Sequence, residues 1–320
     1  MKWSFSASRT FARCQRKWYF SEILGQPRQK DPYKKEVYAL KQLQSVEAWR
    51  GSLVDHIISE MIIPGLNKHR PLKEAEIVDY AMRLADIQLE FAKSKKHRTP
   101  GMTKTGAGEA YCALYDIEYN GGLKEEQISK AKEEIKSSLH NMLSSDLLTR
   151  MNGSDVYIIA QRSLRFTYAE TAISCTPDAI VFFRSNPPLI IDWKVHAFAN
   201  VEYRMQLGVY AVALASVKPH KDFPAKLAVK PEEIDLIEYQ LLKNHQRNYK
   251  LSLHDVIDAE DYVFQSIEQM NRAISRVEDP SCANSLATPR SLSACTTCQF
   301  KKLCWEGPTL QKGLLGGGLS

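Results

Sequence analysis

The chain has 320 residues, of which 44% are hydrophobic and 25% are charged, and its formal net charge is +6. A chain of this length can bury a substantial core as one domain or two. It has no apolar run near the roughly 18 residues of a membrane helix, and no apolar segment after the N-terminus like that of a signal peptide. We therefore expect a cytoplasmic protein without membrane contact, whose seven cysteines do not pair as disulfides.

Positive charge is concentrated at the N-terminal end. Residues 1–50 contain 11 Lys or Arg and 4 Asp or Glu, so the remainder of the chain is close to neutral. Aromatic residues alternate with these charges, among them Trp3, Phe11 and Trp18. Basic and aromatic side chains together are typical of a nucleic-acid-binding surface, but a solvated face above an ordinary core has the same composition. This stretch alone leaves both interpretations open.

Helical periodicity dominates the first half of the chain. A helix is expected in "FSASRTFARCQRKWYF", residues 5–20, with Ser6 or Ser8 as its N-cap. Residues 36–63 predict one or two helices that end before Pro64. Further helices are expected over residues 71–92 and 124–150. Between them lies a Lys-, Thr- and Gly-rich stretch, residues 93–109, that predicts a mobile loop or lid.

The second half changes to short β-branched or aromatic runs. They predict strands within residues 155–169, 175–183, 188–194 and 234–242, a hairpin turn at 184–188, and helices over 203–217 and 256–277. We therefore expect an α/β fold in which helices surround a central three- or four-stranded β-meander, not a βαβ repeat. We assign residues 1–310 to one domain with a helical insertion at about 60–150, and residues 311–320 to a flexible tail.

Two acidic residues and a lysine stand at the ends of two neighbouring predicted strands. Asp178 follows Pro177 at the start of one strand, and Asp192 and Lys194 end the next, on one face of it. Two carboxylates that converge at a sheet edge repel unless a cation lies between them, and Mg²⁺ or Mn²⁺ prefers such oxygen-rich sites. A lysine beside them can orient a metal-bound water. The alternative is a simple Lys–Asp surface pair at a strand end.

The spacing P-D-(x)13-D-x-K resembles that of the PD-(D/E)xK nuclease superfamily. The resemblance implies a restriction-endonuclease-like core, a central mixed β-sheet flanked by helices, in which Asp178, Asp192 and Lys194 are catalytic. Gln206 and Tyr210 follow as Q-x-x-x-Y, as in RecB-type members, and lie on one face of a helix at this spacing. In such members they orient the lysine or the DNA strand.

The segment "WRGSLVDHIISEMI" is similar to a helix of this superfamily that begins with glycine and carries a histidine as an additional metal ligand. The usual spacing puts Asp55 at that position, whereas His56, the matching residue type, comes one residue later. Successive helical residues point about 100° apart, so only one of the two faces the site. The sequence does not choose between them. Two further departures are Cys175, where glycine is common, and Val195-His196, where Thr-Gly is common.

Four cysteines at the two ends of the chain form another pattern. Cys295, Cys298 and Cys304 are spaced C-x2-C-x5-C, and Cys14 lies 281 residues before the first of them. Cysteines so closely spaced in a cytoplasmic protein usually bind a metal. The arrangement resembles that of iron–sulfur nucleases of the AddB type, the CRISPR-associated spacer-acquisition nucleases and exonuclease V, which implies a [4Fe–4S] cluster held by these four residues. A structural Zn²⁺ site is the alternative.

The resemblance as a whole implies a stand-alone Mg²⁺- or Mn²⁺-dependent DNA nuclease that acts on single-stranded DNA or DNA ends, in DNA repair, recombination or anti-phage defence. We expect DNA contact by Arg13, Arg16 and Lys17 near the cluster, and by Lys301 and Lys302. The chain has no G-x-x-x-x-G-K-[ST] motif, so a helicase or defence protein would be a separate partner. The alternatives are a catalytically inactive nucleic-acid-binding adaptor and a zinc-stapled structural protein.

Overall fold

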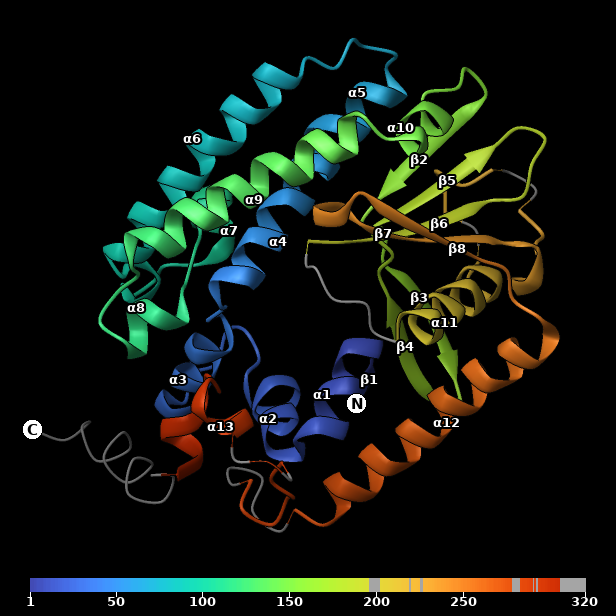
Figure 1. The fold of residues 1–320 in the computed structure, drawn as a ribbon. Helices are drawn as coiled ribbons and strands as arrows, with labels where there is room; N and C mark the ends of the chain where they lie inside the picture. The colour runs from blue at the N-terminus through green and yellow to red at the C-terminus, as the bar shows by residue number, and fades with distance from the viewer. Residues whose placement is uncertain are drawn as a thin grey trace, which may run out of the picture.

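The computed structural model describes residues 1–195, 202–218, 220–224, 227–277, 283–289, 291 and 293–305. Its elements follow one another around a ring-like outline, with a helical arm on one side and the sheets on the other (Figure 1). The N-terminal helices and the C-terminal helical residues lie next to each other where the ring closes. No helix among the described residues is long and apolar enough to cross a membrane. The predicted tail, residues 311–320, lies outside the described residues.

The N-terminal segment forms a short strand and several helical turns: β1 (Lys2–Trp3), α1 (Phe5–Arg13), α2 (Gln15–Tyr19), η1 (Phe20–Leu24) and α3 (Pro32–Lys41). The N-cap of α1 is Ser4, whose Oγ accepts a hydrogen bond from the Ala7 N–H at 3.2 Å. The prediction of Ser6 or Ser8 as N-cap was wrong, because the extended backbone of β1 ends at Ser4 and the helix begins directly after it.

The helical arm consists of α4 (Val46–Ile57), η2 (Ile58–Ile62), α5 (Ile63–Asn67), α6 (Glu74–Lys93), η3 (Lys96–Arg98), α7 (Lys104–Ala107), η4 (Gly108–Ala110), α8 (Tyr115–Tyr119), α9 (Glu125–Leu143) and α10 (Asp146–Met151). The helix expected over residues 71–92 is confirmed as α6. The predicted stop before Pro64 was wrong: the π-helical turn η2 leads into α5, and Pro64 lies in the first turn of α5, where its missing N–H costs little. The single helix expected over residues 124–150 is divided, because Ser145 caps α10.

The central sheet has five strands in the order β2-β5-β6-β7-β8, formed by β2 (Val156–Ala160), β5 (Ala179–Phe183), β6 (Leu189–Lys194), β7 (Asp235–Gln240) and β8 (His245–Tyr249). A smaller sheet has the order β1-β4-β3, with β3 (Leu164–Tyr168) and β4 (Thr171–Cys175). The hairpin β5–β6 is confirmed. The predicted meander was wrong at two points. The run at residues 155–169 divides into β2 and β3, which lie in different sheets. In addition, α11 (Glu202–Ser216) carries the chain across the sheet, so that β7 runs parallel to β6.

The core lies on both faces of the central sheet. Successive residues of β6 alternate between two apolar clusters: Ile190 belongs to the cluster beneath α11 and α12 (Leu253–Ser275), and Leu189 and Ile191 belong to the cluster beneath α4, α6 and α9. A strand covered on both faces has a continuous apolar sequence, which is why this run of residues shows no alternation. The mixed α/β architecture with helices on both sides of the sheet is therefore confirmed (Figure 1).

Two of the contacts between the helical arm and the sheet come from polar side chains of α4 and α5. Arg50 on α4 is buried, and its guanidinium donates to the Val195 carbonyl at the end of β6 and forms an ion pair with Glu134 on α9. Asn67 at the end of α5 contacts the edge strand β2 as another strand would: its Nδ2 donates to Ile158 O at 2.7 Å, and its Oδ1 accepts from Ile158 N at 2.9 Å. Asn67 thereby satisfies both backbone groups of Ile158 at the sheet edge.

We predict that Asn67→Ala lowers the free energy of unfolding by about 1–3 kcal/mol, because it leaves the two backbone groups of Ile158 without protein partners. Urea unfolding followed by circular dichroism measures the change. The matched control is Asn152→Ala, at an exposed asparagine that ends α10. Equal stability of Asn67→Ala and the control would show that the amide does not hold the arm to the sheet.

Candidate active site

Asp178 and Asp192 lie opposite each other at one end of the β5–β6 hairpin. The pairing of Ala179 with Ile191 puts the residue before β5 level with Asp192. Asp178 Oδ2 accepts a hydrogen bond from the backbone N–H of Trp193 at 2.9 Å, which fixes its carboxylate beside β6. The short connection between the strands thus brings the two acids together, as the sequence predicts.

Asp55 joins this pair from α4. Its Oδ1 accepts from Trp193 Nε1 at 2.8 Å and from Gln161 Nε2 at 2.8 Å, and the same Gln161 nitrogen lies 3.3 Å from Asp178 Oδ1. One amide therefore bridges two carboxylates. Gln161 was missed in the sequence because it lies in the turn after β2, outside any periodic pattern.

His56 points away from this group. Its Nε2 lies 3.3 Å from Glu109 Oε1, and Glu109 also accepts a hydrogen bond from the Tyr80 hydroxyl at 2.5 Å. Of the two candidates that the sequence left open, Asp55 lies beside Asp178, and His56 belongs to a separate polar contact between α4, α6 and η4.

Lys194 and Gln206 surround the third carboxylate. Lys194 Nζ lies 2.6 Å from Asp192 Oδ2, and Gln206 Nε2 donates to Asp192 Oδ1 at 3.2 Å. The same amide nitrogen lies 2.7 Å from the Tyr210 hydroxyl. Asp192 is only 1% exposed, so the ion pair is buried and is not the surface pair of the alternative interpretation. Burying an ion pair of this kind costs desolvation free energy, so the pair contributes little to the stability of the fold. Its presence therefore favours a functional role.

The four distant cysteines line one cavity of about 430 Å³: Cys14, Cys295, Cys298 and Cys304. Backbone and guanidinium N–H groups face two of the sulfurs: Lys17 N lies 3.3 Å from Cys14 Sγ, and Arg16 Nη1 lies 3.9 Å from Cys304 Sγ. None of the four forms a disulfide within the described residues. Cys112 and Cys175 are buried elsewhere, and Cys282 lies outside the described residues. The structure therefore brings the two ends of the chain together at the predicted cysteine set.

A family model described as the PD-(D/E)XK nuclease superfamily matches residues 2–305. The chain belongs to the PD-(D/E)XK nuclease superfamily. Among solved structures, one titled "Crystal structure of SSO0001" is similar at 14% identity, with a TM-score of 0.31, over 71% of this chain and 96% of that chain. A comparison with curated proteins found no match.

PD-(D/E)XK nucleases typically use Mg²⁺ or Mn²⁺, and the three carboxylates are the oxygen donors that such ions prefer. Within the described part of the chain, however, no three His, Cys, Asp or Glu side chains are arranged to hold a metal ion. The positive or polar partners at this site include Lys194, Gln161, Gln206 and the two N–H groups of Trp193. The residue chemistry fits a divalent cation, which would take over the role of these partners.

Burial sets the protonation of the site. It raises the pKa of Asp178 well above its ordinary value, and the neighbouring Asp192 carboxylate raises it further, against the opposing effects of Lys194 and the Trp193 N–H. Burial likewise raises the pKa of Asp55. Burial alone would lower the pKa of Lys194, but Asp192 and Asp178 hold it above the ordinary value. The lysine keeps its proton while the carboxylates repel one another, which prepares them for an added cation.

We predict that Asp178→Asn stabilises the metal-free protein at neutral pH. Because the folded protein raises the pKa of Asp178, the contribution of this group to stability is present in acid and is lost as the pH rises through the raised pKa. Asparagine does not ionise, so the variant does not lose this stability as the pH rises. Its side-chain oxygen still accepts the hydrogen bond from the Trp193 N–H. Thermal unfolding in chelator should give equal midpoints in acid, below the ordinary pKa of aspartate, and a higher midpoint for the variant near neutral pH.

The control for this experiment is Asp155→Asn, at an exposed aspartate. It should follow the wild-type protein at every pH. A midpoint for Asp178→Asn below that of the wild type at neutral pH would contradict the inferred cost of ionising Asp178.

Proposed function

We propose that this protein is a Mg²⁺- or Mn²⁺-dependent deoxyribonuclease that hydrolyses phosphodiester bonds at the ends of DNA or in single-stranded DNA. The observation that carries the proposal is the meeting of Asp55, Asp178 and Asp192 beside Lys194 at one end of the central sheet. Membership of a nuclease superfamily supports the reaction class. We place the protein in the cytoplasm, in repair, recombination or anti-phage defence, alone or with a helicase or defence protein.

Each side chain has a distinct role in this proposal. Asp178, Asp192 and Asp55 bind the divalent cation, which when present supplies Lewis-acid chemistry and a more acidic water. Lys194 retains its proton and donates to the attacking water or to a nonbridging oxygen of the scissile phosphate, offsetting the charge that develops there. Gln206 on α11 forms hydrogen bonds to the Asp192 carboxylate and to the Tyr210 hydroxyl, and it thereby fixes the position of both groups.

A non-catalytic nucleic-acid-binding adaptor is the second candidate. The direct contact between Lys194 and Asp192 favours it, because an ammonium at 2.6 Å already compensates the carboxylate that a cation would need. An adaptor binds DNA without cutting it in any metal, so cleavage assays separate the two candidates.

We predict that Lys194→Ala lowers the cleavage rate by at least about 10²-fold, the scale on which loss of one transition-state donor acts. The assay uses end-labelled single- and double-stranded DNA with Mg²⁺, Mn²⁺ or chelator. Lys243→Ala, at an exposed lysine in η6 (Leu241–Lys243), is the matched control and should cut at the wild-type rate. Cleavage by Lys194→Ala at that rate would refute the site, and a wild-type protein that binds DNA without cutting it would establish the adaptor.

We further propose that the four-cysteine cavity holds a [4Fe–4S] cluster, with structural Zn²⁺ as the alternative. Positive charge supports a thiolate-bound group there, because the described residues that line the cavity include five cations and no Asp or Glu: Arg9, Arg13, Arg16, Lys17 and Lys301. A group bound by Cys14 and the three C-terminal cysteines would close a very long loop of the chain. The cluster has a structural role in this proposal, and the surrounding cations, together with Lys302, contact DNA.

We predict that Cys298→Ser removes the brown colour and the bound iron of protein purified anaerobically and lowers its unfolding temperature. Iron and sulfide analysis with visible absorbance measures the change. Cys112→Ala, at a buried and isolated thiol, should keep both iron and colour. Stoichiometric zinc without iron in the wild-type protein would replace the cluster by the zinc site, and unchanged absorbance in Cys298→Ser would rule out its role as a ligand.

A further inference from the structure

Helix α1 lines two cavities at once. One, of about 490 Å³, contains Lys194, Gln206 and Tyr210 of the candidate active site, together with Lys2 and hydroxyl groups of Ser174 and Thr176. The other is the four-cysteine cavity. Ser6 and Arg9 of α1 line both. The catalytic lysine and the cysteine set are therefore joined by a continuous lining along this helix.

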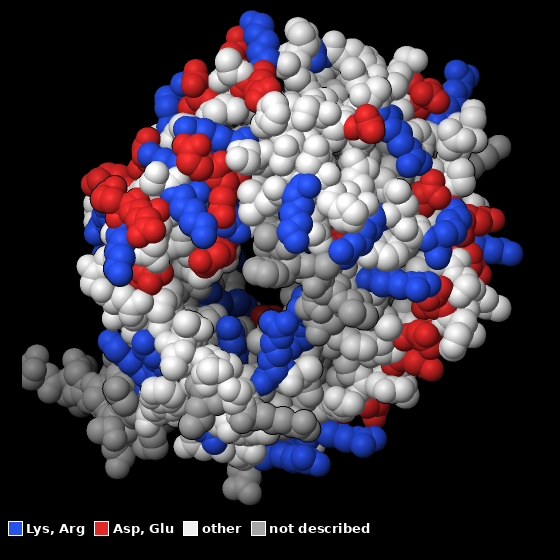
Figure 2. Space-filling view, in the orientation of Figure 1, with Lys and Arg blue, Asp and Glu red and all other residues white. Residues whose placement is uncertain are grey.

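The lining is strongly positive. The cavity that contains Lys194 is also lined by Lys2 and Arg9, and Glu22 is the one acidic residue among its described lining residues. In the described part of the chain, the four-cysteine cavity is lined by five cationic residues and no acidic one. Lys and Arg side chains gather around the central hollow of the molecule in the space-filling view (Figure 2). Cations interleaved with hydroxyl groups are the donors that bind the phosphates of a nucleic-acid backbone.

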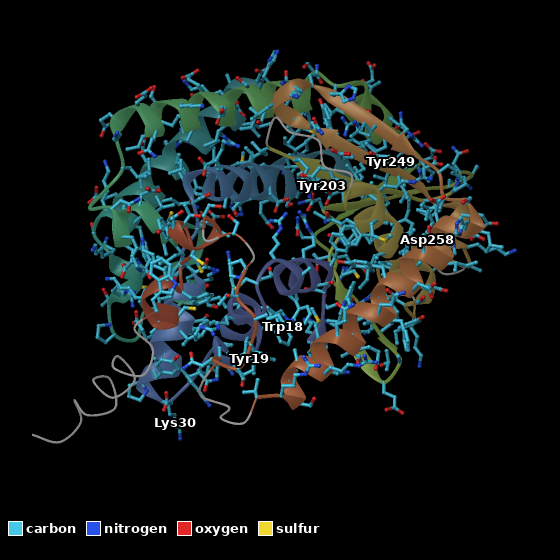
Figure 3. All side chains as sticks on the ribbon, turned by 60° about the horizontal axis from the view of Figure 1, so that its bottom comes forward. Trp18, Tyr19, Lys30, Tyr203, Tyr249 and Asp258 are labelled. Atoms are coloured by element: carbon cyan, nitrogen blue, oxygen red, sulfur yellow. The ribbon has the colours of Figure 1, made fainter. Side chains whose placement is uncertain are left out.

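Arg9 and Lys194 line the same cavity. Burial raises the pKa of Tyr203, while the positive charges of Lys194 and Arg9 both oppose that rise, so both act on the same phenol. Lys194 Nζ lies 5.5 Å from the centre of the Tyr203 ring. In the turned view, Tyr203 lies above α1 and Trp18 below it (Figure 3). Arg9 on α1 lines both the cavity that contains Lys194 and the cavity that contains Cys14.

We propose that Arg9, with Ser6, binds the phosphate next to the scissile phosphate of single-stranded DNA, so that the strand runs from Lys194 along α1 toward the four-cysteine cavity. The proposal rests on the proposed nuclease function. Cavities of this size hold ligands no larger than a few nucleotide units, which favours a single strand over an intact duplex. The guanidinium of Arg9 suits this role because it can donate two parallel hydrogen bonds to one phosphate.

The first experiment measures binding without cleavage. Fluorescence anisotropy of a labelled single-stranded oligonucleotide is recorded in chelator over a range of salt concentrations for wild type, Arg9→Gln and Arg9→Lys. Loss of one phosphate contact should reduce the slope of log K against log salt by about 0.7 and weaken binding about tenfold at low salt. Arg9→Lys should restore the slope. Arg83→Gln, an exposed arginine on α6 that lines neither cavity, is the control and should match wild type.

The second experiment locates the phosphate. A neutral methylphosphonate replaces the phosphate next to the scissile one, and the cleavage rate is measured with Mn²⁺. The substitution should slow the wild-type protein about tenfold and should not slow Arg9→Gln any further, since the contact is already absent there. Equal slowing of both proteins, or an unchanged salt slope in Arg9→Gln, would overturn the proposal.

The outcomes distinguish this proposal from the proposed nuclease function and from the proposed metal group at the cysteines. A reduced slope in Arg9→Gln with no cleavage by the wild-type protein refutes the nuclease function but keeps the phosphate site. Wild-type cleavage with an unchanged slope keeps the nuclease and removes the role of Arg9. Iron is measured in every sample. If Arg9→Gln loses iron and binds DNA more weakly, with no change in the slope of log K against log salt, the proposal is overturned. In that case Arg9 serves only to balance the charge of the bound thiolates.

Discussion

Three carboxylates at one end of the central strands impose the main constraint on this structure: the buried Asp192 and the half-buried Asp55 and Asp178. Buried acids need donors, and the fold provides them from separate elements: both N–H groups of Trp193, the amides of Gln161 and Gln206, and the ammonium of Lys194. The helical arm, the hairpin and α11 must therefore all be in place before the acids are satisfied. The raised pKa of Asp178 shows that this compensation is incomplete, as expected where a cation is to be added.

The parts of this site that depend on local spacing could be predicted from the sequence. Asp178 and Asp192 follow from a short hairpin, and Gln206 and Tyr210 from one turn of a helix. The choice at α4 could not be made in this way. Both faces of that helix have polar partners, and those partners come from elsewhere in the chain: Gln161 and Trp193 for Asp55, and Glu109 for the residue that follows it.

The direction of β7 relative to β6 could not be predicted from the sequence for a related reason. The apolar runs of β6 and β7 predict buried strands whichever way they pair, and only the crossing of α11 makes β7 parallel. The predicted helix boundaries were wrong where a single residue or turn changed the hydrogen-bond pattern. Ser4 caps α1 before either predicted serine, and the π-helical turn η2 lets Pro64 enter a helix that it was expected to end. By contrast, the cysteine set depends on residue type and spacing alone, and its four members line one cavity.

The N-terminal segment connects these parts physically. β1 pairs with β4 of the smaller sheet, and Trp3 Nε1 donates to Ser266 Oγ on α12 at 2.7 Å. The ring of Phe11 packs edge-on against that of Trp18, with 5.0 Å between the ring centroids. Trp18 lies on α2, whose N-cap is Cys14. The position of α1 is thus fixed from the sheet on one side and from the four-cysteine cavity on the other. Arg9 faces both cavities, so the charge that would balance bound thiolates also belongs to the proposed phosphate path. A group bound at the cysteines would then hold α1, and with it one wall of the active site, in the position that a DNA strand requires.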